Sequence, residues 1–185
     1  MTKLRLQAGM VLATLLLFVA ALALNECVFA RSEYVRGINW IYLPAGVRLL
    51  CTLLFGEAGA VGLLFASWLV CFGYFFPHDF SRAFMGGIIA AVAPYLVYRL
   101  AQLRFGLKAS LVNLTPRRLL ACVLAYSVAS PLLYHAWLFL SGAREHLLQG
   151  LLVMFVGDLS GTLIVIYTLK GLLTLCTRRS TKLPC

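Results

Sequence analysis

The stretch Phe155-Val156-Gly157-Asp158-Leu159-Ser160-Gly161 places an aspartate near the middle of an apolar run that extends from Leu148 to Cys176. A carboxylate at the centre of a bilayer costs about 2.5–3.5 kcal/mol on insertion scales unless it is paired. Among the basic residues of the sequence, Arg48 alone lies at a similar depth in another apolar run. The sequence therefore predicts that Arg48 and Asp158 form an ion pair inside a helical membrane domain.

The composition supports a membrane protein. Hydrophobic residues make up 62% and charged residues 12% of the 185-residue chain, and the mean hydropathy is +0.93. Soluble domains are about 45–50% apolar and about 25% charged, so a soluble domain is excluded. The basic residues behind the net charge of +10 flank apolar runs and form no basic and aromatic patch, so we expect no nucleic-acid partner.

Successive apolar runs predict an all-α integral membrane protein, a compact bundle of about six transmembrane helices in one domain, 1–185. The first run has the layout of a signal peptide, with a cleavage site at Val28-Phe29-Ala30. It is long for a signal peptide, so we expect it to be retained. The predicted spans are 8–29, 38–55, 60–76, 83–103, 118–140 and 148–176.

The second run is short and contains Pro44 as well as Arg48. As one helix from Ile38 to Phe55, it would just cross the hydrocarbon core at about 1.5 Å per residue. If Pro44 instead begins the helix, Tyr42 and Leu43 would be non-helical and would have to be buried in protein or line a cavity. Both alternatives remain open from the sequence.

Basic residues are distributed unequally between the two sides of the predicted bundle. Both ends of the chain and the linker between the fourth and fifth spans are basic, whereas the connections on the other side carry few basic residues. Because positively charged loops stay in the cytoplasm, we expect both termini on the cytoplasmic face of a bacterial inner membrane. The linker predicts a cytoplasmic basic patch of Arg99, Arg104, Lys108, Arg117 and Arg118, suited to anionic lipid.

The sequence predicts no catalytic residues, metal site or cofactor. It contains no Ser–His–Asp, paired-carboxylate, phosphate-loop or H-E-x-x-H arrangement. The histidines His78, His135 and His146 match no zinc motif, and the six cysteines include no C-x-x-C pair. We therefore expect a non-enzymatic protein. Gly157 and Gly161 form a G-x-x-x-G motif, which indicates close contact with another helix.

Two motifs resemble a known family. Leu43-Pro44-Ala45-Gly46-Val47, followed by Leu54-Phe55-Gly56, resembles the W-P-P-[SA]-G…L-x-G signature of the bacterial membrane-associated sensor domain of the MASE type, first type. The later stretch 157–161 resembles that family's G-D-x-x-G. The similar region covers about 39–173, although Tyr42-Leu43 stands where the family has tryptophan and proline. The family usually precedes a cytoplasmic output domain, whereas only about 177–185 follow the last predicted span here.

The resemblance implies a sensor-like or scaffold subunit that acts through a separate membrane or cytoplasmic signalling protein. The alternative is a small-molecule binding or transport subunit similar to the substrate-binding component of a vitamin uptake system. The compact predicted bundle and the second run, which contains Pro44, motivate this alternative. The pair of Arg48 and Asp158 is either ligand- or proton-sensitive, or a structural pair that fixes helix register.

Overall fold

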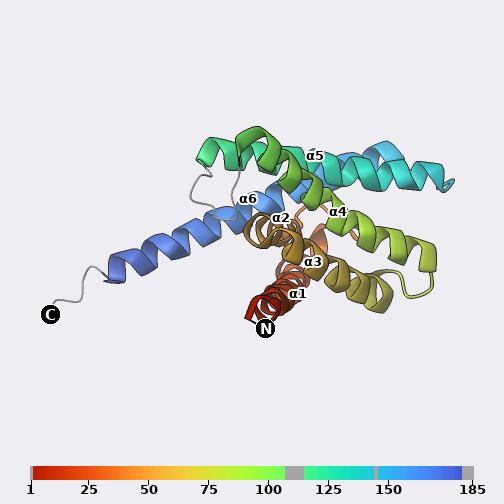
Figure 1. Ribbon diagram of the computed structural model, residues 1–185. Helices are drawn as coiled ribbons and strands as arrows, with labels where there is room; N and C mark the ends of the chain where they lie inside the picture. Colours follow the sequence, from red (N-terminus) through yellow and green to blue (C-terminus); the bar gives the residue numbers. More distant parts are fainter. Residues whose placement is uncertain (1, 107–114, 144–145, 181–185) are drawn as a thin grey trace.

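The computed structural model describes the backbone of residues 2–106, 115–143 and 146–180 (Figure 1). Most of these residues lie in helices, which confirms the all-α class. The α-helices are α1 (Thr2–Phe29), α2 (Leu43–Phe55), α3 (Glu57–Val70), α4 (Phe80–Phe105), α5 (Pro116–Leu140) and α6 (Leu147–Ser180).

Five of the helical segments are long and apolar enough to cross a membrane. They are Lys3–Ser32, Glu57–Phe75, Phe80–Phe105, Pro116–Leu140 and Leu147–Leu175. This agrees with a multi-pass membrane protein.

In the second predicted span, the structure has the second of the two alternatives left open by the sequence, a helix that begins near Pro44. Its helix, α2, has 13 residues and begins at Leu43, with Pro44 in the first turn. At about 1.5 Å per residue such a helix is about 20 Å long, short of the roughly 30 Å hydrocarbon core. Tyr42, just before the helix, has a non-helical φ of −131° and ψ of 87°, and Pro44 lies in the first turn, where its missing N–H removes no helical hydrogen bond. The helix therefore does not extend back to Ile38.

A short hairpin precedes α2 and was not expected from the sequence. A 3-10 turn (Ala30–Ser32) leads from α1 into two antiparallel strands, β1 (Glu33–Val35) and β2 (Ile38–Asn39). Gly37 turns the chain with a φ of 85°, which favours glycine because it has no Cβ. The hairpin directs residues 40–42 back into the helical bundle.

The end of α3 is wound more loosely than an α-helix. Residues Cys71–Phe75 form a π-helix, η2, and the N–H of Phe76 donates to the carbonyl of Cys71 at 2.8 Å. Such segments are uncommon and often border functional sites, because the wider turn re-aims the neighbouring side chains.

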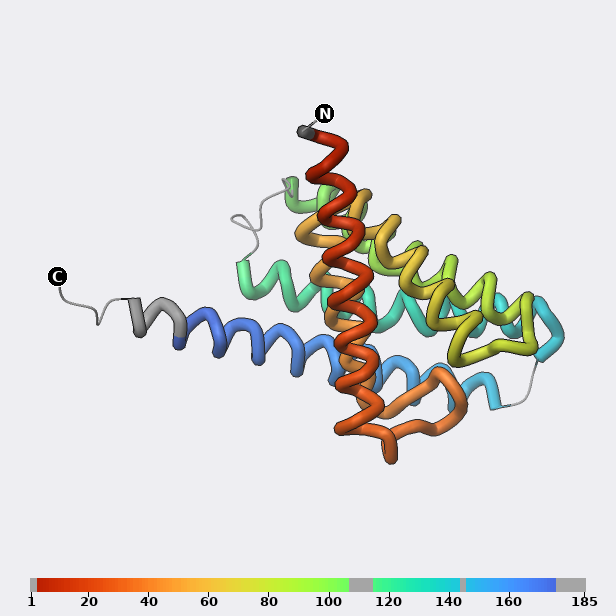
Figure 2. The backbone as a smooth tube through the Cα atoms, turned by 90° about the horizontal axis from the view of Figure 1, so that it is seen from below, coloured from red at the N-terminus to blue at the C-terminus, as the bar shows by residue number. Residues whose placement is uncertain are grey.

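The helices cross rather than forming a parallel bundle. Helix α1 packs against α2 and α3, α4 lies between α3 and α5, and α6 packs against both α5 and α2. In Figure 2, α1 runs down the view, whereas α5 and α6 run across it. Both views show the C-terminal part of α6 continuing beyond the other helices (Figures 1 and 2). The first part of α6 therefore helps to form the core and the rest leaves it.

Candidate functional site

A cavity of about 50 Å³ lies between the hairpin, η2 and the helices α2, α4, α5 and α6. Apolar and aromatic side chains form most of its wall. Both charged residues singled out from the sequence line it. The polar residues in its lining are Asn39, Tyr42, Arg48, Ser130, Tyr134 and Asp158.

Arg48 is 8% exposed and is held by aromatic rings. Its Cζ lies 5.1 Å from the ring centroid of Phe18 and 5.2 Å from that of Tyr42. Its Nη2 also donates a hydrogen bond of 3.3 Å to the Tyr42 hydroxyl. Cation–π contacts of this kind stabilise a desolvated cation by about 2 kcal/mol. Nε of Arg48 has no hydrogen-bond partner among the described residues, so the guanidinium keeps free donor capacity.

Asp158 is 1% exposed, on the part of α6 that faces the cavity. It attracts Arg48 electrostatically and lies beside Ser130. Its Oδ2 has no hydrogen-bond partner within the part of the chain that the structure describes. The two residues predicted to meet thus share one cavity, but the described atoms do not form a closed salt bridge between them. Each charge keeps an unsatisfied atom.

Other buried polar atoms near Asp158 are also unsatisfied. The hydroxyl of Tyr126 interacts electrostatically with both charges, and Thr162 is one helical turn from Asp158. Neither hydroxyl, nor that of Ser127, completes a hydrogen bond to a described residue. Most buried polar groups in proteins are satisfied by protein or by water. This cluster therefore has unused capacity for water or for a polar ligand.

The non-helical segment before α2 forms one wall of the site and is hydrogen-bonded to α6 on one side and to α1 on the other. The N–H of Tyr42 donates to the carbonyl of Gly157 at 3.2 Å, and the Ser160 hydroxyl donates to the carbonyl of Trp40 at 3.1 Å. The N–H of Leu43 donates to Oδ1 of Asn25, on α1, at 2.9 Å. These bonds satisfy backbone groups that could not face lipid.

Two glycines of α6, Gly157 and Gly161, lie directly against this segment. A Cβ built at Gly157 would overlap the carbonyl oxygen of Asn39, and one at Gly161 would overlap that of Tyr42. The G-x-x-x-G motif does make a close contact, but with extended backbone rather than with the helix that we expected. The helix contact is at Gly46, where a Cβ would lie 2.6 Å from Cβ of Val165.

The hairpin and η2 close the other side of the cavity. Nη2 of Arg36 donates to the carbonyl of Tyr74 at 2.8 Å, and the Tyr74 hydroxyl donates to Oε2 of Glu26 at 3.2 Å. The ring of Phe76 packs beside Gly37, 3.4 Å from where a Cβ would be. Three segments distant in the sequence are thus joined at this wall by Arg36 and Tyr74.

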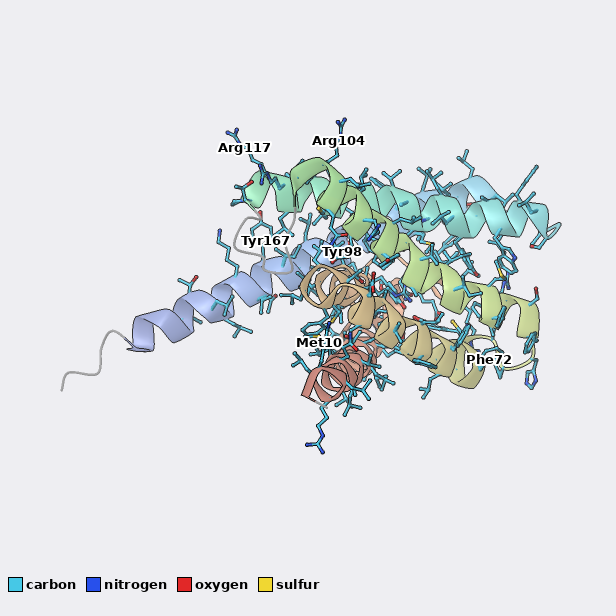
Figure 3. The ribbon with its side chains drawn as sticks, viewed as in Figure 1. Met10, Phe72, Tyr98, Arg104, Arg117 and Tyr167 are labelled. Atoms are coloured by element: carbon cyan, nitrogen blue, oxygen red, sulfur yellow. The ribbon has the colours of Figure 1, made fainter. Side chains whose placement is uncertain are left out.

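The predicted basic patch lies elsewhere, at the end of the bundle where α4 ends and α5 begins. Arg104 and Arg117 point away from the helices in Figure 3, and both are exposed, as is Arg99. Arg118 is half-buried, with its Cζ 5.5 Å from the centroid of Phe105. Lys108 lies outside the described residues. The described part of the patch is separate from the cavity.

Sequence reasoning missed the aromatic residues around the two charges. Phe18 and Tyr126 are entirely buried, but nothing distinguishes them in an apolar sequence. His135 is 5% exposed, with Nδ1 2.9 Å from the carbonyl oxygen of Pro131, whereas His78 and His146 are exposed. Across the described ranges, no group of three or more His, Cys, Asp or Glu side chains could hold a metal ion.

Comparisons of the chain with protein-family models, with curated proteins and with solved structures each found no match. The resemblance to the MASE-type sensor domain therefore stays a prediction that rests on its two motifs. The residues that line the cavity indicate what kind of molecule it can bind. Two opposite charges with unsatisfied atoms, set in aromatic walls, are suited to binding a small polar molecule.

Proposed function

We propose that this protein is a non-enzymatic membrane sensor subunit that acts through a separate partner protein. The cavity with Arg48 and Asp158 receives the stimulus, and α6 transmits it. The observation that carries this proposal is the continuity of α6. The helix bears Asp158 in the cavity and then extends beyond the bundle without interruption (Figures 1 and 2).

The contact between α6 and its neighbours allows a coupled movement. At Gly157 and Gly161 the helix lies directly on the backbone of the segment 39–42. Hydrogen bonds from Ser160 and to the carbonyl of Gly157 join the two, so they move together. A small shift or rotation of a helix is a common form of signalling motion. A change in the charge or polarity around Asp158 would therefore be carried to the free end of α6.

The far end of α6 offers an apolar surface for a partner. Tyr167 is 66% exposed there, which is much more than the buried residues one or two turns earlier. A second apolar helix in the same membrane fits such a surface, since helices associate in lipid through side-chain packing. Exposed apolar residues of this part of α6 include Tyr167, Leu169, Leu172 and Leu175.

Site-specific crosslinking in native membranes tests the proposal. A photoreactive phenylalanine analogue would replace Tyr167 in one strain and Leu12, which is 57% exposed on α1, in another. We expect a discrete protein adduct from position 167 that position 12 does not give. The yield of this adduct should change when Asp158→Asn is added. Equal adducts at the two positions, or an adduct insensitive to Asp158→Asn, would contradict the proposal.

A second candidate is a subunit for uptake of a small molecule. It is favoured by the break in the second segment, because transporters often bind substrate where a membrane helix is interrupted. Here Tyr42, just before the helix start, lines the cavity. Flux of a bound ligand into proteoliposomes would distinguish the two, because a sensor binds its ligand without carrying it across.

A further inference from the structure

We propose that the cavity binds a small zwitterion, a molecule about the size of glycine that carries both a carboxylate and an ammonium group. This inference rests on the proposed role of the cavity as the stimulus site, and it names the ligand class. It follows from three features: the chemistry of the two charged side chains, the atom without a hydrogen-bond partner that each of them keeps, and the size of the cavity.

The carboxylate of the ligand fits Arg48. The guanidinium is permanently charged and donates from several N–H groups, of which Nε has no partner among the described residues. The rings of Phe18 and Tyr42 lie 5.1 and 5.2 Å from its Cζ, and Nη2 donates to the Tyr42 hydroxyl, so Nε is a donor that is left for an acceptor. Hydrogen bonds between arginine and a carboxylate are short and charge-assisted, about twice as strong as neutral ones.

The ammonium group fits the opposite part of the cavity. Oδ2 of Asp158 has unused acceptor capacity within the described structure, and the rings of Phe75, Phe76 and Tyr134 line the same space. Aromatic faces together with a carboxylate are the usual surroundings of a bound ammonium group. A second acceptor is close by, since Ser130 also lines the cavity.

Charge balance favours a zwitterion over a simple ion. Arg48 and Asp158 together are neutral, so a ligand with one charge would leave the site charged and one buried side chain without a partner. An unpaired buried charge is the costly state. A ligand with both charges satisfies both side chains, whereas acetate or methylammonium satisfies one.

The size of the cavity limits the ligand. A volume of about 50 Å³ has room for roughly three or four water molecules, since one water needs about 10–15 Å³. This space favours a ligand of about the size of glycine over one of the size of leucine. Ile89 and Met154 are among the bulky apolar residues of its wall.

Cys71 provides a reporter inside the cavity. Its thiol is 7% exposed and belongs to the lining, whereas Cys27 is exposed at the end of α1. The full chain in lipid nanodiscs would be treated with methyl methanethiosulfonate, a small thiol reagent, and modification of each cysteine followed by mass spectrometry. Glycine should slow modification of Cys71 and leave Cys27 unchanged. Acetate, methylammonium and leucine should protect Cys71 much less.

Two conservative variants test which charged side chain binds which group of the ligand. Asp158→Asn should lose protection by glycine and gain protection by acetate, because Arg48 then has no opposing charge. Arg48→Gln should shift the preference toward methylammonium. If glycine protects Cys71 of the unaltered protein no better than acetate or methylammonium at equal concentration, the inference is wrong. That result is independent of crosslinking at Tyr167, which tests the partner.

Discussion

Gly161 lies directly against the carbonyl oxygen of Tyr42, where any larger side chain would overlap it. Tyr42 in turn accepts a hydrogen bond from Arg48 and supplies one of the two rings that hold its guanidinium. The position of Arg48 on α2 therefore depends, through one residue, on the lack of a side chain on α6. The helix that carries Asp158 thus also positions the opposite charge.

This relationship predicts the effect of Gly161→Ala. The added methyl group must displace the segment around Tyr42, and overpacking of this kind costs about 1–3 kcal/mol. We expect a corresponding fall in the stability measured by thermal unfolding in mild detergent. Gly171→Ala is the matched control on the same helix, because nothing lies within 4 Å of a Cβ there. It should be neutral or stabilising by up to about 1 kcal/mol. Equal losses from the two changes would contradict this account.

Removing either buried charge should destabilise the protein. Asp158→Asn or Arg48→Leu leaves one charge without its counterpart, which typically costs about 3–5 kcal/mol. The exchange Arg48→Asp with Asp158→Arg should recover part of the loss. Recovery should be incomplete because Phe18 and Tyr42 are placed to hold a cation on α2, not on α6. Chemical denaturation of the four proteins measures this, and an exchange worse than the sum of the single changes would show that the residues are not coupled.

The Asn25 side chain should contribute more to the stability of the fold than its position on a lipid-facing helix suggests. Its Oδ1 accepts from the N–H of Leu43 at the start of α2, and the side chain is 1% exposed. Asn25→Leu leaves that buried N–H without an acceptor, at a cost of about 1–3 kcal/mol. Thr14→Val is the control on the same helix, since the Thr14 hydroxyl donates to the carbonyl of Met10 one turn away, within α1. Thermal unfolding should show the larger loss for Asn25→Leu.

The contact between Arg36 and Tyr74 should control access to the cavity. Arg36→Ala removes the bond from the hairpin to η2, so the hairpin should open more often and Cys71 should react faster with a small thiol reagent. Arg31→Ala, in the turn before the hairpin, is the control. An unchanged rate at Cys71 in Arg36→Ala would mean that reagents reach the cavity by another route.

The distribution of basic residues predicts which side of the membrane each end of the bundle faces. A cysteine in place of His78, between η2 and α4, should react in intact cells with a membrane-impermeant maleimide. A cysteine in place of Arg117, at the start of α5, should react only after the membrane is permeabilised. The reverse pattern would overturn the expected topology.

The long helices were predictable from hydropathy, because a helix in lipid needs about 20 apolar residues whatever it packs against. That Arg48 and Asp158 lie at one cavity was predictable for a similar reason, because two charges at one depth in apolar surroundings must be compensated. The ion pair expected between them is not formed among the described atoms. Pro44 indicated that the second segment could be broken. In these cases a local property of the sequence has a direct energetic consequence.

The surroundings of the two charges were not predictable. Phe18, Tyr126 and the rings near the hairpin are apolar or aromatic residues among many others, and only their long-range contacts select them. The π-helix at 71–75 has no simple sequence signal. The contact of Gly157 and Gly161 was predicted, but not its partner, since a small-residue motif shows that something approaches closely without showing what it is.

The docking of residues 39–42 also has a consequence for biosynthesis. The backbone bonds that allow this segment to lie inside the bundle come from Asn25 on the first helix and from Gly157 and Ser160 on the last. Until α6 has been synthesised, Trp40 and Tyr42 lack these partners and cannot leave water without a penalty. We therefore expect the second segment to become buried only after α6 has been synthesised, although it precedes α6 by about a hundred residues in the chain.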